Sequence, residues 1–280
     1  MLAIDPDGTC VLCRREANPP PLAPPNAARS SRARVLVLLL LLVLLTGSGF
    51  ALRRYLLASS ADFAVFLPGK AGALQTKNDV GRSGAYFLPT GYEGHPLPLL
   101  VAIHGTGGRG EGMVRFFREA AEREKFIVVA PDSRMPPDGQ DSWDVGDHPG
   151  EITPDYVHVK ACVAEVLAMP RVSIDPTRVL IAGHSGGAST APYVATNEEP
   201  YTAFAVLHGG VFASGLGKRK VRGWFSTGLS DAMRGPAGVE QAANRAKSAG
   251  VTQVEYRVYP GGHEIGDREI TELLEWWLKR

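Results

Sequence analysis

The pentapeptide Gly183-His184-Ser185-Gly186-Gly187 constrains the fold more than any other stretch of this sequence. It directly follows an apolar run, residues 178–182, which is typical of a buried strand. Residues 188–194, which come after it, have the character of a helix. A serine between glycines at such a junction indicates a tight strand-to-helix turn, because glycines lack the Cβ atoms that would collide there. We therefore expect the Ser185 hydroxyl to stand above a sheet edge, with a helix N-terminus behind it that favours developing negative charge.

Strand-like and helix-like segments alternate over residues 61–280. This alternation predicts one α/β domain with a mostly parallel, doubly wound sheet and helices on both faces. The polar stretch 133–154, which contains Trp143, is long enough to predict a functional loop. The expected strands are 61–67, 85–88, 97–103, 126–130, 178–182, 203–208, 221–227 and 254–259, and the expected helices are 111–124, 155–169, 188–194, 239–249 and 269–278.

The composition excludes several classes of function. The chain has 280 residues, 44% of them hydrophobic, and a formal net charge of +1 without a basic stripe, so a nucleic-acid partner is not expected. Its three cysteines include one C-x-x-C pair, Cys10 and Cys13, which cannot complete a four-ligand zinc site alone. Cys162 is interpreted as a small buried hydrophobe. No metal or cofactor is therefore expected.

The N-terminal segment predicts a membrane or export function. Residues 1–34 are expected to form a disordered cytoplasmic tail, since residues 14–34 are rich in Pro, Ala and Arg. Residues 35–52 are leucine-rich and uncharged, and about 18 residues is the lower limit for an apolar helix that spans a membrane. The arginines before this helix predict that the N-terminus stays inside and the domain 61–280 is exported. Two alternatives stay open: a retained signal anchor, or a signal peptide cleaved near residues 59–61, which would make the protein secreted.

Three separated residues have the order expected of a catalytic triad. A serine needs a base that removes its proton, and His263 follows the last expected strand in a glycine-rich loop. Asp231 follows the preceding strand and is expected to orient the imidazole. Asp267 is a rival only four residues beyond His263, and Asp175 precedes the serine, so both fit the order Ser185, Asp231, His263 less well.

A second glycine-rich turn, His104-Gly105-Thr106-Gly107-Gly108, follows the expected strand 97–103. No G-K-[ST] sequence follows it, which disfavours a phosphate-binding loop. We expect the backbone amides of Thr106 and Gly186 to form an oxyanion hole, and His104 to support the turn. Trp143 is interpreted either as a wall of the substrate pocket or as loop packing.

These elements resemble those of α/β-hydrolase-fold serine esterases over about residues 60–280. The sequence is most similar to the branch that contains polyhydroxybutyrate depolymerases, feruloyl esterases and carboxylesterases. This resemblance implies a triad of Ser185, Asp231 and His263, an acyl-enzyme intermediate, and a small-molecule or oligomeric ester as substrate. It is carried by Val101-Ala102-Ile103-His104-Gly105-Thr106-Gly107-Gly108, by Ile174-Asp175-Pro176-Thr177-Arg178-Val179 before the pentapeptide, and by Val258-Tyr259-Pro260-Gly261-Gly262-His263.

Two other functions remain open at this point. A peptidase of the same fold would use the same three residues. A non-catalytic binding module of this fold is the second alternative, although the complete set of Ser, Asp and His favours an enzyme.

Overall fold

The computed structural model describes residues 69–76, 82–134, 143–144, 151–210 and 215–279. All of them belong to one compact unit, Val65–Arg280. The expected tail 1–34, the apolar segment 35–52 and the strand expected at 61–67 lie outside the described residues. None of the helices within the described ranges is long and apolar enough to cross a membrane.

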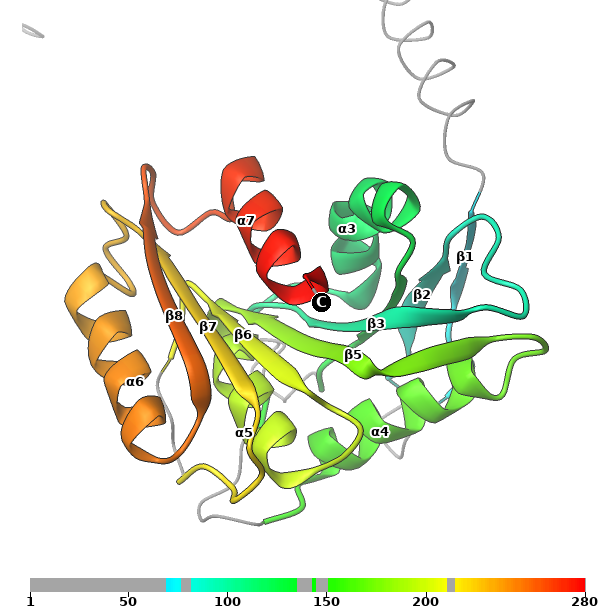
Figure 1. Ribbon diagram of the computed structural model, residues 1–280, viewed down its shortest axis with the longest axis horizontal. Helices are drawn as coiled ribbons and strands as arrows, with labels where there is room; N and C mark the ends of the chain where they lie inside the picture. The colour runs from blue at the N-terminus through cyan, green and yellow to red at the C-terminus, as the bar shows by residue number, and fades with distance from the viewer. Residues whose placement is uncertain (1–68, 77–81, 135–142, 145–150, 211–214, 280) are drawn as a thin grey trace, which may run out of the picture. The chain divides into compact units, whose positions relative to one another are not determined.

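Within these ranges, eight strands form one sheet in the order β1-β2-β4-β3-β5-β6-β7-β8 (Figure 1). The pairs β1–β2 and β2–β4 are antiparallel, and the other neighbouring pairs are parallel. The mostly parallel sheet predicted from the alternating pattern is thereby confirmed. The strands are β1 (Lys70–Ala73), β2 (Gly84–Leu88), β3 (Pro96–Ile103), β4 (Ile127–Pro131), β5 (Ser173–His184), β6 (Ala203–Leu207), β7 (Arg222–Gly228) and β8 (Thr252–Tyr259).

Helices cover both faces of the sheet, as predicted (Figure 1). The helices α3 (Gly110–Glu124) and α7 (Asp267–Leu278) lie on one face. The other face is covered by α4 (Pro154–Leu167), α5 (Thr190–Asn197) and α6 (Pro236–Ser248).

Each face has its own apolar core because successive side chains of a strand point to opposite faces. In β3, Leu99, Val101 and Ile103 face the core under α4, α5 and α6, whereas Leu100 and Ala102 face α3 and α7. All five are fully buried, as expected for a strand of a parallel sheet that is covered on both sides.

Local capping features mark the start of α4 and the end of α3. The hydroxyl of Thr153 caps α4 by accepting a hydrogen bond from the Tyr156 amide, and Pro154 occupies the first turn, where its missing N–H costs nothing. Helix α3 ends at Glu124, and the residue that caps it, Lys125, adopts the left-handed conformation.

Strand β1 was not expected from the sequence, and α6 begins at Pro236 rather than at residue 239. Two further differences lie on either side of Ser185. The strand expected at 178–182 begins at Ser173 instead. Asp175 and the following proline are typical of a turn, but the chain here continues to pair with β3 after one register shift. The helix expected at 188–194 is preceded by a 3-10 turn, Ser185–Ser189, so that α5 begins only at Thr190.

Parallel pairing brings the carboxyl ends of the central strands to one edge. Ile103 pairs with Gly183, His184 pairs with Leu207, and Gly228 pairs with Tyr259. The loops after β3, β5, β6, β7 and β8 therefore leave the sheet at the same edge, where ligand sites of such sheets form.

Candidate active site

Ser185 lies on a sharply bent turn directly after β5. Its backbone is left-handed, with φ of 50°, which is uncommon for a residue with a side chain. The turn requires small neighbours. A Cβ on Gly183 would lie 2.1 Å from the Gly187 carbonyl oxygen, and a Cβ on Gly187 would lie 2.4 Å from the His104 carbonyl oxygen. The predicted tight turn around Ser185 is thus present, held by close backbone packing.

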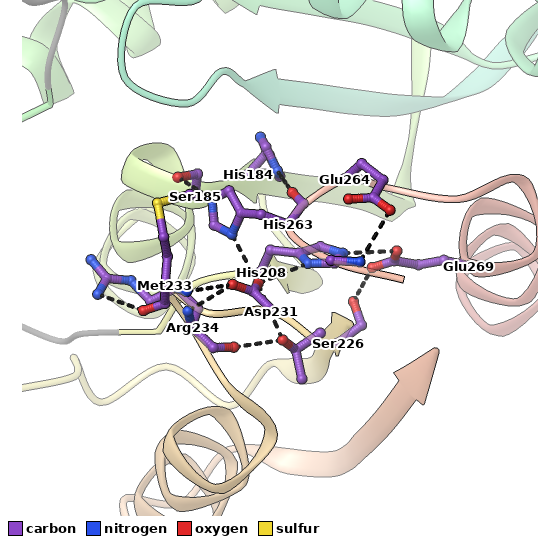
Figure 2. Close-up of polar contacts among 12 residues, drawn as sticks. His184, Ser185, His208, Ser226, Asp231, Met233, Arg234, His263, Glu264 and Glu269 are labelled. Carbon is purple, nitrogen blue, oxygen red and sulfur yellow. Dashed lines mark hydrogen bonds and ion pairs between the residues drawn. The ribbon is translucent and has the colours of Figure 1, made fainter. Parts of the chain in front are cut away.

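The structure brings Ser185, His263 and Asp231 together, as the order of the motifs predicts (Figure 2). Nε2 of His263 lies 2.7 Å from Oγ of Ser185, and Nδ1 of His263 lies 2.8 Å from Oδ2 of Asp231. In this arrangement Nδ1–H donates to the carboxylate and leaves the Nε2 lone pair for the serine proton. The three side chains come from loops after β5, β8 and β7.

Asp231 is held as an ionised carboxylate. Its Oδ1 accepts hydrogen bonds from the amides of Met233 (2.9 Å) and Arg234 (2.8 Å). Burial alone would raise the pKa of Asp231, but the hydrogen bonds from His263, these amides and His208 hold the pKa well below its usual range. Asp231 therefore keeps its charge under His263 at neutral pH.

The carboxylate that contacts His263 Nδ1 is that of Asp231 and not that of either rival aspartate. Asp175 accepts hydrogen bonds from Thr177 and Arg178 at the far end of β5, and these bonds lower its pKa to about 2. Asp267 is the first residue of α7.

Thr106 and Gly186, the expected oxyanion donors, lie against each other beside Ser185. A Cβ on Gly186 would lie 3.2 Å from the Thr106 amide nitrogen, and a Cβ on Gly105 would lie 3.1 Å from the Ser185 Cβ. The Thr106 amide donates to no other described residue. These positions suit two backbone donors next to a reacting carbonyl.

His104 supports this turn, as expected. Its buried Nε2 accepts a hydrogen bond from the Ser133 amide at 2.9 Å, which places the ring proton on Nδ1, where it donates to the Gly105 carbonyl at 2.7 Å. The indole of Trp143 packs on His104 with ring centroids 5.1 Å apart and donates to the His104 carbonyl at 2.8 Å. Trp143 is thus anchored to the turn that contains His104 and Thr106, and its contact with substrate stays a prediction.

His184, the second residue of the pentapeptide, fixes the loop that carries His263. Its Nε2–H donates to the His263 carbonyl oxygen at 3.0 Å. Burial lowers the pKa of His184, so this ring is neutral at neutral pH.

Sequence reasoning missed a buried network behind Asp231. His208, the residue after β6, lies between Asp231 and Glu269 of α7 (Figure 2), with each ring nitrogen 3.1 Å from a carboxylate oxygen. The available signal was the position of His208 at the carboxyl end of a central strand. Nothing local in the sequence pointed to Glu269, which reads as an ordinary first-turn acid of a helix.

His208, Asp231 and His263 also offer ligand atoms within 4.8 Å of one another, a spacing that a metal ion could use. However, both histidines direct Nδ1 at the same oxygen, Oδ2 of Asp231. Hydrogen bonds therefore account for the whole cluster, and its donors are engaged with the carboxylate.

Comparisons with known proteins bear on the fold and the family of this chain. No curated protein matches the chain at a significant level. Solved structures with a similar fold include the acetyl xylan esterase from Aspergillus awamori, at 17% identity over 75% of this chain and 99% of that chain with a TM-score of 0.59. A carboxylesterase from Mesorhizobium loti is similar at 18% identity over 75% of this chain and 99% of that chain, with a TM-score of 0.56. Pyrococcus horikoshii acylaminoacyl peptidase is similar at 15% identity over 79% of this chain and 44% of that chain, with a TM-score of 0.58.

These likenesses lie at low identity and concern the fold. The family is carried by a separate match, in which residues 100–274 fit the model of the alpha/beta hydrolase family. This match spans more than half of the chain, from the middle of β3 to α7, and includes the turns that carry Ser185, Asp231 and His263. The protein therefore belongs to the alpha/beta hydrolase family.

Proposed function

We propose that this protein is a serine hydrolase that cleaves carboxylic esters through an acyl-enzyme. The observation that carries the proposal is the continuous hydrogen-bonded series from Ser185 Oγ through His263 to Asp231, with distances of 2.7 and 2.8 Å. A nucleophile, a base and an orienting carboxylate in this relation are what acyl transfer requires.

In the first half of the reaction, Oγ of Ser185 forms a bond to the acyl carbon. His263 Nε2 takes the serine proton, and the carbonyl π electrons move to the oxygen. That oxyanion is stabilised by the amides of Thr106 and Gly186. The carbon–alkoxy bond then breaks, and the imidazolium of His263 returns the proton to the leaving alcohol.

In the second half, water repeats the same steps. His263 removes a proton from water as the water oxygen bonds to the acyl carbon. Collapse of the second oxyanion breaks the bond to Ser185, and the serine recovers its proton from His263. Asp231 stabilises the imidazolium in both halves.

The surroundings of the triad favour a substrate with an apolar group. Leu229 and Met233 are 69% and 62% exposed on the loop that carries Asp231. In the view of Figure 2, the Met233 side chain runs toward Ser185. Large exposed apolar side chains beside a reactive serine can form a wall for a ligand, and here they suit the acyl or alcohol part of an ester.

The proposal is tested by labelling with a fluorophosphonate and by hydrolysis of p-nitrophenyl esters of increasing acyl length. We expect Ser185 to be labelled and the wild type to hydrolyse the esters, while kcat falls by about 10⁶-fold in Ser185→Ala. A folded wild-type protein that is neither labelled nor active would instead favour the non-catalytic module.

A peptidase of the same fold is the second candidate, favoured by the structural likeness to Pyrococcus horikoshii acylaminoacyl peptidase. The same residues can attack an amide, so matched ester and anilide substrates with one acyl group distinguish the two. Comparable kcat/KM for both would assign the protein to the peptidases.

We further propose that residues 35–52 hold the catalytic domain at the exported face of a membrane, because this segment is uncharged and follows an arginine-rich stretch. Fractionation of cells that express the full chain tests this proposal. Full-length protein that resists carbonate extraction from membranes is expected. A shortened protein outside the membrane fraction would indicate signal cleavage, and a full-length protein in the cytoplasm would contradict both alternatives.

A further inference from the structure

His208 is a buried histidine placed between two buried carboxylates. Its side chain is 1% exposed, those of Asp231 and Glu269 are 0% and 1% exposed, and each ring nitrogen faces one of the two. Nδ1 lies 3.1 Å from Oδ2 of Asp231, and Nε2 lies 3.1 Å from Oε2 of Glu269. A neutral imidazole has one N–H and one lone pair, so it would turn a lone pair toward one of these oxygens.

The other partners of the two acids are hydrogen-bond donors. Oε1 of Glu269 accepts a hydrogen bond from the Ser226 hydroxyl at 2.5 Å, while the Trp224 indole donates to the same serine oxygen. Oδ1 of Asp231 accepts two backbone amides. Burial would lower the pKa of His208, but the hydrogen bonds and charges of Glu269 and Asp231 outweigh it and raise the pKa.

The charge of His208 acts directly on the triad. His208 and His263 donate to the same oxygen of Asp231, and their ring centroids are 5.7 Å apart. The remaining titratable ring against His208 is that of His184, 5.8 Å away and neutral. The buried charges are therefore the carboxylates of Asp231 and Glu269 and the imidazolium of His208, and the exposed carboxylate of Glu264 also interacts electrostatically with His208.

We propose that His208 is a permanently protonated positioning residue, which fixes Oδ2 of Asp231 beneath His263 and offsets part of the carboxylate charge. This inference rests on the proposed function for its catalytic consequence. A positive charge next to His263 disfavours the imidazolium of His263, so the base stays neutral at lower pH than it would beside an uncompensated Asp231. The hydrolase thereby keeps its activity further into the acidic range.

The test uses the full chain with ¹⁵N-labelled histidine, followed by NMR from pH 5 to pH 9. Nitrogen shifts distinguish an imidazolium from either neutral tautomer, and the spectrum of His208→Gln assigns the His208 signals. We expect both nitrogens of His208 to stay protonated over the whole range in the wild type. A neutral His208 at pH 7 in the wild type would overturn the proposal, and this measurement does not need enzymatic activity.

The second arm compares His263 in the wild type and in Glu269→Gln. The amide in this variant can donate to Nε2 of His208, so His208 becomes neutral and keeps its Nδ1–H bond to Asp231. We expect the midpoint of the His263 titration to rise, but by less than about one pH unit, because the positive charge of His208 next to His263 is lost together with the negative charge of Glu269 on the far side of that ring. The acidic limb of the kcat/KM profile should move by the same amount.

Glu275→Gln is the matched control, because it removes one carboxylate from the exposed side of the same helix α7. It should leave the His263 midpoint unchanged. An unchanged midpoint in Glu269→Gln as well would overturn the proposal. Loss of the proposed function would appear separately, as a wild-type protein without ester hydrolysis in which His208 and His263 still titrate as described.

Discussion

The ring of His184 holds the backbone of His263 through a hydrogen bond of 3.0 Å from Nε2 to the His263 carbonyl oxygen. His184 precedes Ser185, and its own strand β5 is fixed in the centre of the sheet. The turn that carries Ser185 and the loop that carries His263 are thus joined directly, across 79 positions of sequence. This bond sets the position of the imidazole relative to the serine.

Loss of this bond should therefore impair catalysis without unfolding the protein. We expect His184→Ala to lower kcat by about 10²-fold, since a misplacement of about 1 Å can have that effect. His184→Gln, which keeps a donor, should recover part of the loss. Steady-state kinetics with circular dichroism checks both variants, and a wild-type kcat in His184→Ala would show that the His263 loop is held by other contacts.

Asp231→Asn should abolish the correct tautomer of His263 while keeping the shape of the side chain. By analogy with other Ser-His-Asp enzymes, kcat should fall by about 10⁴-fold. Asp267→Asn is the matched control and should leave kcat near that of the wild type. If instead Asp267→Asn were the inactive variant, the orienting acid would be Asp267.

Gly186→Ala should disturb the proposed oxyanion hole, because the added methyl group would clash with the Thr106 side chain. The new methyl group would lie 2.6 Å from Oγ1 of Thr106 and 3.2 Å from its amide nitrogen. We expect kcat to fall by up to about 10²-fold, the lower range for one lost oxyanion donor, with little change in KM. The double variant Gly186→Ala/Thr106→Ala removes the closer contact and should regain activity, whereas equal losses in both variants would contradict this explanation.

Met233→Ala should change substrate preference if Met233 lines the acyl or alcohol site. For an ester whose long acyl chain reaches Met233, we expect kcat/KM to fall by about 10-fold, because a buried apolar contact of this size contributes about 1.5 kcal/mol. Acetyl esters should be affected less. Val157→Ala is the control, because Val157 is also an exposed apolar residue but lies on α4. An equal loss of kcat/KM for esters of all acyl lengths in Met233→Ala would argue against a specificity role.

Cys162 should be unreactive in the folded protein. Burial raises the pKa of its thiol to about 12, and the side chain is fully buried in the core. Iodoacetamide at pH 8 should modify Cys162 only in denaturant, as followed by peptide mass spectrometry. Above the ordinary pKa of a thiol, the unfolded chain loses this proton while the folded chain keeps it. The free energy of unfolding should therefore decline at alkaline pH, and Cys162→Ala should weaken that decline.

The sequence by itself predicted most of the strands and helices, and it predicted the three residues that the structure brings together, Ser185, Asp231 and His263. Apolar runs identify the parallel strands, and the glycine-rich turns after them mark Ser185, His263 and the Thr106 turn. Parallel pairing then places these turns at one edge, because the strands run in the same direction. Local patterns were sufficient here, since each signal lies within a few residues of the group it predicts.

Only the tertiary structure decided which distant side chains support that triad. His208 and Glu269 are 61 positions apart, and no spacing in the chain relates them. Their contact depends on how α7 docks on the sheet and on the left-handed backbone of His208, with φ of 53°. Side-chain direction across three packed elements is a property of the assembled core. The order of Ser185, Asp231 and His263 could therefore be predicted from the sequence, whereas the charges around Asp231 could not.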